Sequence, residues 1–129
     1  MRWMPLPGGA AVRGRALREV AEPVDFALVL ASGPGPAWPY RRIAWPDFWI
    51  PRDRGDALDA LREAHRRLGR GERVEVACGG GIGRTGTALA ALSMLDGLGP
   101  DEAVRWVRQH YHRRAVETPW QRRWLREAR

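Results

Sequence analysis

One glycine-rich segment constrains this chain more than any other stretch. This signature loop reads Cys78-Gly79-Gly80-Gly81-Ile82-Gly83-Arg84-Thr85-Gly86. The mostly apolar run before it, Val74 to Ala77, predicts a buried strand. The run after it, Thr87 to Leu95, is rich in alanine and leucine and favours a helix. The sequence therefore predicts a strand, a glycine-rich loop and a helix in immediate succession.

A loop of this composition is suited to binding an anion. Its backbone N–H groups can point at one ligand, and the start of the following helix adds a partial positive charge. Arg84 adds a planar set of donors that fits two phosphate oxygens. The same positive field favours the thiolate of Cys78, which is its nucleophilic form, and Thr85 can donate its hydroxyl to that thiolate. The residues expected to bind phosphate are Gly79, Gly80, Gly81, Ile82, Gly83 and Arg84.

The spacing of Cys78, Arg84 and Thr85 resembles the signature loop of the cysteine-dependent protein tyrosine phosphatase superfamily. The residues from Gly81 to Gly86 resemble the tyrosine-specific branch, and the small size resembles a compact bacterial or dual-specificity member. The alternative is an ordinary glycine-rich turn with a buried structural cysteine. The position of the loop between a strand and a helix favours the phosphatase interpretation, in which Cys78 is the nucleophile.

A second motif, Trp45-Pro46-Asp47-Phe48, resembles the mobile general-acid loop of the same superfamily. A phosphocysteine mechanism needs an acid that protonates the leaving oxygen and then serves as the base for water. The resemblance implies that Asp47 is this acid. Asp53 and Asp56 instead suit the cap and the first turn of the helix that follows.

A third segment, Glu117-Thr118-Pro119-Trp120-Gln121, resembles the glutamine loop that positions the hydrolytic water. Glu117 replaces the first glutamine of that motif, and Gln121 keeps the second. The resemblance implies a catalytic role for Gln121. The residues also fit a helix start with Thr118 as N-cap and Gln121 at the third position, and the two interpretations are compatible.

The chain departs from the family pattern before the nucleophile. Ala77 stands where most relatives have a histidine that braces the loop. Its absence leaves the loop amides, the helix terminus, Arg84 and Thr85 to favour the thiolate. We also find no phosphotyrosine-recognition loop ahead of the catalytic residues.

The remaining sequence predicts an α/β fold. We expect a hairpin within residues 1–22, strands at 24–30 and 41–45, and helices that start near Asp53 or Asp56, Arg84, Pro100 and Thr118. Together they predict a mostly parallel central sheet flanked by helices, with the signature loop between a strand and the central helix. Glu75 needs a polar partner in its apolar strand, and Arg84 is one candidate. Trp120 and Trp124 are spaced for packing on one face of the last helix.

Length and composition bound the class of protein. With 129 residues, we expect a single phosphatase domain over 1–129. One cysteine permits no internal disulfide, which fits a reducing compartment, and the N-terminus shows no apolar leader. The longest apolar run, Phe26 to Ala31, is too short to cross a membrane. These features predict a cytoplasmic protein without a membrane partner, and nothing in the sequence indicates an oligomeric state.

The net charge of +7 comes from 22 basic residues, all of which are arginine. We expect these arginines on a solvated surface, since they are scattered rather than gathered into a stripe, which argues against nucleic-acid binding. His65 lies on an apolar helix face, where a satisfied core histidine is typical. His110 and His112 diverge around a helix end. We therefore expect no metal site and no cofactor.

The sequence predicts a cysteine-based phosphomonoesterase that acts on phosphotyrosine in proteins or peptides, and on phosphoserine or phosphothreonine as a further option. One alternative is a phosphate-binding pseudo-phosphatase that recognises phosphorylated partners, for which Ala77 is the best support. RNA 5′-phosphates and phosphoinositides are alternative substrates. A rhodanese-like sulfurtransferase would not explain the Trp-Pro-Asp segment.

Overall fold

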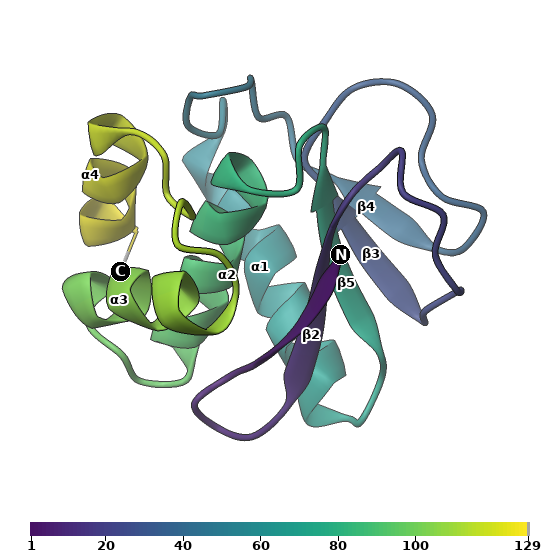
Figure 1. The fold of residues 1–129 in the computed structure, drawn as a ribbon, viewed down its shortest axis with the longest axis horizontal. Helices are drawn as coiled ribbons and strands as arrows, with labels where there is room; N and C mark the ends of the chain where they lie inside the picture. The colour runs from purple at the N-terminus through teal and green to yellow at the C-terminus, as the bar shows by residue number, and fades with distance from the viewer. Residues whose placement is uncertain (129) are drawn as a thin grey trace.

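The computed structural model describes residues 1–128 (Figure 1). Its strands are β1 (Arg2–Pro5), β2 (Ala11–Ala16), β3 (Phe26–Val29), β4 (Tyr40–Arg42) and β5 (Val74–Cys78). Its helices are α1 (Arg54–Gly69), α2 (Gly83–Leu95), α3 (Pro100–His110) and α4 (Pro119–Glu127). None of the helices in this described part is long and apolar enough to cross a membrane.

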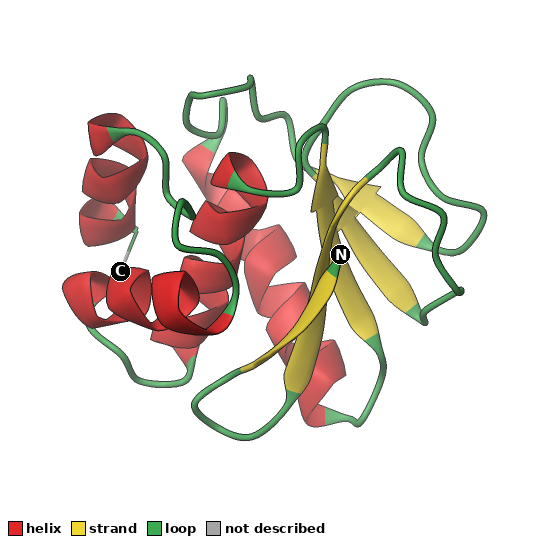
Figure 2. Ribbon diagram, viewed as in Figure 1, coloured by secondary structure: helices red, strands yellow, loops and turns green. Residues whose placement is uncertain are grey.

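The strands form one mixed sheet in the order β1-β2-β5-β3-β4. The pairs β2–β5, β5–β3 and β3–β4 are parallel, and only the edge strand β1 is antiparallel, as the partner of β2 in the predicted N-terminal hairpin. The helices gather on one side of the sheet, while loops cover the other side (Figure 2). The predicted α/β fold with a mostly parallel sheet is confirmed. β5 lies at its centre with a parallel neighbour on each side, and the signature loop starts from this strand.

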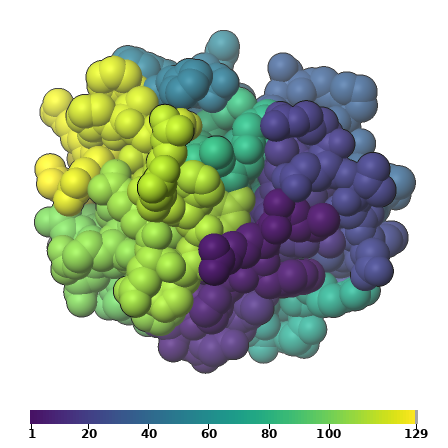
Figure 3. Space-filling view, in the orientation of Figure 1, coloured from purple at the N-terminus to yellow at the C-terminus, as the bar shows by residue number. Residues whose placement is uncertain are grey.

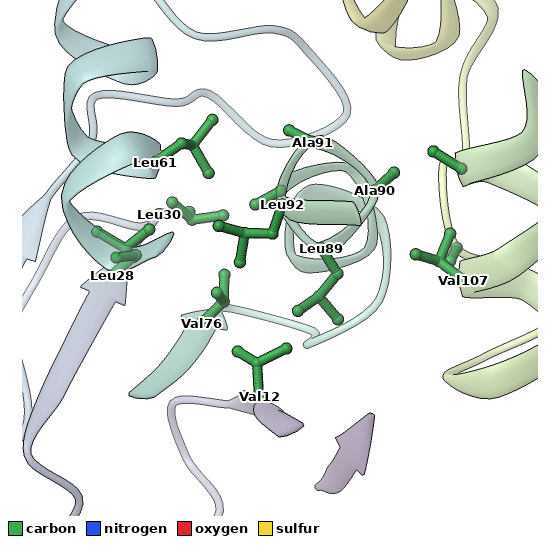
Figure 4. Close-up of a cluster of buried hydrophobic side chains, with 14 of the residues drawn as sticks. Val12, Leu28, Leu30, Leu61, Val76, Leu89, Ala90, Ala91, Leu92 and Val107 are labelled. Atoms are coloured by element: carbon green, nitrogen blue, oxygen red, sulfur yellow. The ribbon is translucent and has the colours of Figure 1, made fainter. Parts of the chain in front are cut away.

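Helix α2 is the centre of the core, as its composition predicted. Every residue from Gly83 to Ser93 is buried. Figure 4 shows α2 end-on, with Leu89 and Leu92 directed towards Val76 of β5 and its neighbours in the sheet, and Ala90 on the side of Val107 from α3. Small alanines allow the neighbouring helices to approach closely, while the leucines fill the space above the sheet. The helix that follows the signature loop is thereby held from several sides.

The element boundaries differ from the predicted ones by a few residues. The strand expected at 41–45 is β4, Tyr40–Arg42, and the strand expected at 24–30 is the shorter β3. Asp53 caps α1 as expected, since its carboxylate accepts the N–H of Asp56 at 2.9 Å.

Two side chains lie elsewhere than the helical spacing suggested. The ring of His65 is not in the core, because its side chain is 33% exposed and bonds Asp96 at 2.6 Å. Trp124 is buried as predicted, but Trp120 is 43% exposed, since α4 packs on the fold along one face only.

The buried Glu75 has partners that the sequence did not identify. Its carboxylate accepts hydrogen bonds from Arg13 at 2.7 Å, from Arg15 at 2.6 Å and from the indole of Trp38 at 2.9 Å. Both arginines are only 3% exposed. The suggestion that Arg84 pairs with Glu75 was therefore wrong, and so was the assignment of all arginines to the surface. Residues 13 and 75 are paired across β2 and β5, a neighbourhood that only the sheet register creates.

We expect the substitution Glu75→Gln to lower the free energy of unfolding by about 3–5 kcal/mol, because it leaves two buried guanidinium groups without their counter-charge. Urea unfolding followed by circular dichroism measures this loss. The matched control is Glu72→Gln, which removes a half-exposed ion pair with Arg67 and should cost less than about 1 kcal/mol. Equal losses for the two variants would contradict the role of Glu75 in holding β2 to β5.

Candidate active site

The signature loop lies at the carboxyl end of β5, the edge of a parallel sheet where ligand sites form in α/β folds. Three further segments border it. In Figure 1, the segment between β4 and α1 lies at the top, between α4 and the sheet. Figure 3 shows the green atoms of the loop between the yellow-green segment before α4 and the dark blue segment after β2. Residues that are far apart in the sequence therefore meet around the loop.

Cys78 is the last residue of β5 and is 2% exposed. Its Sγ atom accepts hydrogen bonds from the N–H of Gly81 at 3.1 Å and from the hydroxyl of Thr85 at 3.0 Å. Gly81 has φ +72°, and a Cβ atom there would lie 2.6 Å from the Ala16 nitrogen. Only glycine fits this position. Two donors directed at one sulfur stabilise its anionic form.

Arg84 lies in the first turn of α2 and is 7% exposed. Its Nη1 atom donates to the carbonyl oxygens of Leu30 at 2.9 Å and Trp45 at 3.0 Å. Its Nε atom has no hydrogen-bond partner among the described residues, and Nη2 lies beside Gly79. One edge of the guanidinium is thus fixed by the backbone. The Nε–Nη2 edge is left for an anion, in the geometry that suits two oxygens of a phosphate.

The acid segment, residues 45–49, brings a carboxylate to the same place. The Oδ1 atom of Asp47 lies 3.4 Å from Nε of Arg84, and the Asp47 side chain is 61% exposed. Trp45 anchors the segment, because it is buried, its ring packs at a tilt against Trp124 with centroids 5.5 Å apart, and its indole N–H donates to the carbonyl of Trp49 at 2.7 Å. The fold therefore brings the acid segment beside the signature loop, although the two lie about thirty residues apart in the sequence.

Gln121 occupies the third position of α4 and is fully buried. Its Oε1 atom accepts the N–H groups of Glu117 at 3.0 Å and Thr118 at 3.2 Å, which completes the predicted capping box. Its Nε2 atom donates to the carbonyl of Trp49 at 3.1 Å. The neighbouring Trp120 donates its indole N–H to the carbonyl of Phe48. The start of α4 is thus fastened to the acid segment by two hydrogen bonds.

Glu117 lies against the signature loop, although the motif resemblance implied a catalytic role only for Gln121. Its carboxylate stands directly over Gly83, where a Cβ atom would come within 1.9 Å of Oε1. Glu117 therefore approaches the loop itself, whereas the amide of Gln121 contacts the acid segment. The signal in the sequence was the place of Glu117 at the first glutamine of the motif that it resembles.

Tyr111 is a further residue that contacts the signature loop. Its hydroxyl donates to the carbonyl oxygen of Gly81, whose N–H bonds the Cys78 sulfur. Burial raises the pKa of Tyr111, and the negative charge of Cys78 raises it further. No motif marks such a contact, because it joins the end of α3 to a backbone atom 30 residues earlier.

Within residues 1–128, no three His, Cys, Asp or Glu side chains are grouped as a metal site requires. The chemistry that the arrangement supports comes from its own side chains. They are a buried thiol with two hydrogen-bond donors at its sulfur, a guanidinium edge without a hydrogen bond to the described residues, and a solvent-exposed carboxylate beside that edge.

Comparisons with known proteins identify relatives of this arrangement. The family model for protein-tyrosine phosphatases matches residues 36–117. The human tyrosine-protein phosphatase non-receptor type 4 (Homo sapiens) is 37% identical over 93 residues, which are 67% of this chain and 10% of that protein. The chain thus spans about a tenth of the length of the curated relatives that it matches.

Solved structures show the same fold. A mutant form of Tk-PTP is 30% identical, with a TM-score of 0.79 over 98% of this chain and 93% of that one. Kinase associated phosphatase has a TM-score of 0.77 over 97% of this chain and 90% of that one, at 15% identity. The matched family region is more than half of the sequence and contains Asp47, Cys78 and Arg84. The chain therefore belongs to the protein-tyrosine phosphatase family, a family of cysteine-dependent hydrolases.

Proposed function

We propose that this protein removes phosphate from phosphotyrosine in proteins or peptides through a phosphocysteine intermediate. The observation that carries the proposal is the convergence of the Cys78 sulfur, the Nε–Nη2 edge of Arg84 and the Asp47 carboxylate at one loop. Phosphotyrosine is favoured as the substrate because the matched human relative is a tyrosine-protein phosphatase.

In the first step, the backbone N–H groups of the signature loop and the Nε–Nη2 edge of Arg84 bind the phosphate dianion. The Cys78 thiolate attacks phosphorus in line with the leaving oxygen. The S–P bond forms as the P–O bond breaks, and Asp47 gives its proton to the departing tyrosine oxygen. Because the transition state is loose, most of the rate comes from positioning and from stabilising the equatorial oxygens.

In the second step, the Asp47 carboxylate takes a proton from water. The resulting nucleophile attacks phosphorus, and the S–P bond breaks. The thiolate leaves with the Gly81 N–H and the Thr85 hydroxyl directed at its sulfur. Inorganic phosphate departs, and Asp47 is again protonated for the next turnover. Each step uses side chains, backbone and water.

The first test is hydrolysis of p-nitrophenyl phosphate and of a phosphotyrosine peptide in the presence of EDTA. We expect turnover by the natural chain, none by Cys78→Ser, and a loss of about 10²–10⁴-fold by Asp47→Asn, which can neither give nor take the proton. The loss should be larger with the peptide, because its leaving group is poorer.

A phosphoserine peptide in the same assay separates tyrosine-only from dual specificity. Full activity of Cys78→Ser would contradict the mechanism. If the natural chain binds vanadate but shows no turnover, the proposed enzyme activity is wrong, and the alternative of a module that recognises phosphorylated partners is supported.

Glu117 places a negative charge beside the loop that receives the dianion. We expect Glu117→Gln to lower the inhibition constant for inorganic phosphate by about two- to fivefold, the range for an exposed charge contact. Glu72→Gln, at the opposite end of β5, is the control of equal charge change and should leave that constant unchanged. Equal inhibition constants for the two variants would show that the Glu117 carboxylate does not act on the bound anion.

For Gln121 we propose that its amide holds the acid segment in place for catalysis. In Gln121→Glu the atom facing the Trp49 carbonyl changes from a donor to an acceptor, while the capping acceptor remains. We expect the free energy of unfolding to fall by about 1–3 kcal/mol, together with kcat for the peptide. The control Gln109→Glu changes an exposed residue of α3 in the same way. Unchanged stability in Gln121→Glu would show that the Gln121 amide does not hold the acid segment.

A further inference from the structure

We propose that Tyr111 is a positioning residue of the signature loop, which holds the carbonyl of Gly81 so that the N–H of the same residue stays directed at the Cys78 sulfur. The inference rests on the proposed function, since it explains how the nucleophile of that reaction is prepared. It assigns to Tyr111 an effect on the thiolate that acts through the backbone, without contact to the substrate.

Tyr111 is held in place by its position at the end of α3 and by neighbours on β1 and β2. The residue follows the last turn of α3 and is 6% exposed. Its ring lies so close to Gly14 of β2 that a Cβ atom there would come within 2.5 Å of it. Arg2 of β1 donates to its main-chain carbonyl at 3.2 Å. A side chain packed this tightly presents its hydroxyl as a fixed donor.

Gly81 is the point at which this donor reaches the nucleophile. Its carbonyl accepts the Tyr111 hydroxyl, and its N–H lies 3.1 Å from the Cys78 sulfur. Both groups flank one Cα atom, so a fixed carbonyl limits the rotation that would turn the N–H away. Because glycine has no side chain, its backbone rotates more freely than that of other residues, and the fixed carbonyl offsets this freedom.

The loop needs such a brace because its own residues supply little rigidity. Four of the five residues between Cys78 and Arg84 are glycine, and Ile82 at the helix start makes no side-chain cap. Ala77 offers no hydrogen-bonding side chain beside the nucleophile. Besides Tyr111, the exposed Arg18 side chain donates to the Gly79 carbonyl, and the N–H of Leu17 donates to the Cys78 carbonyl. The Tyr111 hydroxyl is the buried donor that bonds Gly81, the residue whose N–H contacts the Cys78 sulfur.

The hydroxyl keeps its proton over the working range, since burial and the charge of Cys78 raise the pKa of Tyr111 above its ordinary value. The other charged groups around the loop are Glu19, which acts on Tyr111, Arg18 at Gly79, Arg84 with Asp47 at its Nε, and Glu117 over Gly83. The substitution Tyr111→Phe changes none of these groups and preserves the ring that packs on Gly14.

The test compares Tyr111→Phe with Tyr40→Phe, a control at an exposed tyrosine of β4. The readout is the rate of alkylation of Cys78, the single cysteine, by iodoacetamide as a function of pH. We expect the midpoint of this profile to rise by about half to one pH unit in Tyr111→Phe, the size of one lost hydrogen bond. The acid limb of kcat/KM should move with it, and kcat/KM below the midpoint should fall about three- to tenfold.

A second variant approaches the same contact from β2. In Gly14→Ala the new methyl group displaces the ring of Tyr111, so it should shift the alkylation profile in the same direction. The double variant should shift no further than the larger single shift, because both remove one contact. Midpoints equal to that of Tyr40→Phe in folded Tyr111→Phe and Gly14→Ala would overturn the proposal, even if their melting temperatures fall. Alkylation needs no turnover, so this result stays separate from a failure of the proposed hydrolysis.

Discussion

The placement of Cys78 at the end of the central strand is the constraint on which the rest of this structure depends. β5 is paired on both sides, and its buried Glu75 ties it to β2 through two arginines. The strand ends at the nucleophile, and α2 begins five residues later in the centre of the core. A loop of glycines between two such rigid elements has fixed ends and can direct its N–H groups at one point.

Arg84 connects this loop to the other half of the site. Its Nη1 atom bonds the carbonyls of Leu30 and Trp45, so one side chain joins α2 to the end of β3 and to the acid segment. The opposite edge of the guanidinium makes no hydrogen bond within the described residues and faces the Asp47 carboxylate. The residue proposed to bind substrate therefore also organises the backbone around it. Gln121 and Trp120 hold the same segment from α4.

Several features were within reach of the sequence, and others were not. Apolar runs and glycine breaks predicted β5, α2 and the order of the other elements, because these are set by neighbours along the chain. The arginines of β2 look like surface residues, and only the pairing with β5 shows that they neutralise Glu75. The exposed position of Trp120 likewise depends on how α4 packs, which its spacing from Trp124 does not reveal.

Local motifs in the sequence predict the chemistry proposed for this protein, because they hold a thiol, a guanidinium and a carboxylate at characteristic spacings. How these groups are supported follows from the packing of the fold. This packing brought Glu117 over Gly83, directed the amide of Gln121 to the acid segment, and placed the Tyr111 hydroxyl on the Gly81 carbonyl. These contacts join residues distant in the chain to backbone atoms. Every residue carries the same backbone groups, so the residue type at such a position does not reveal the contact.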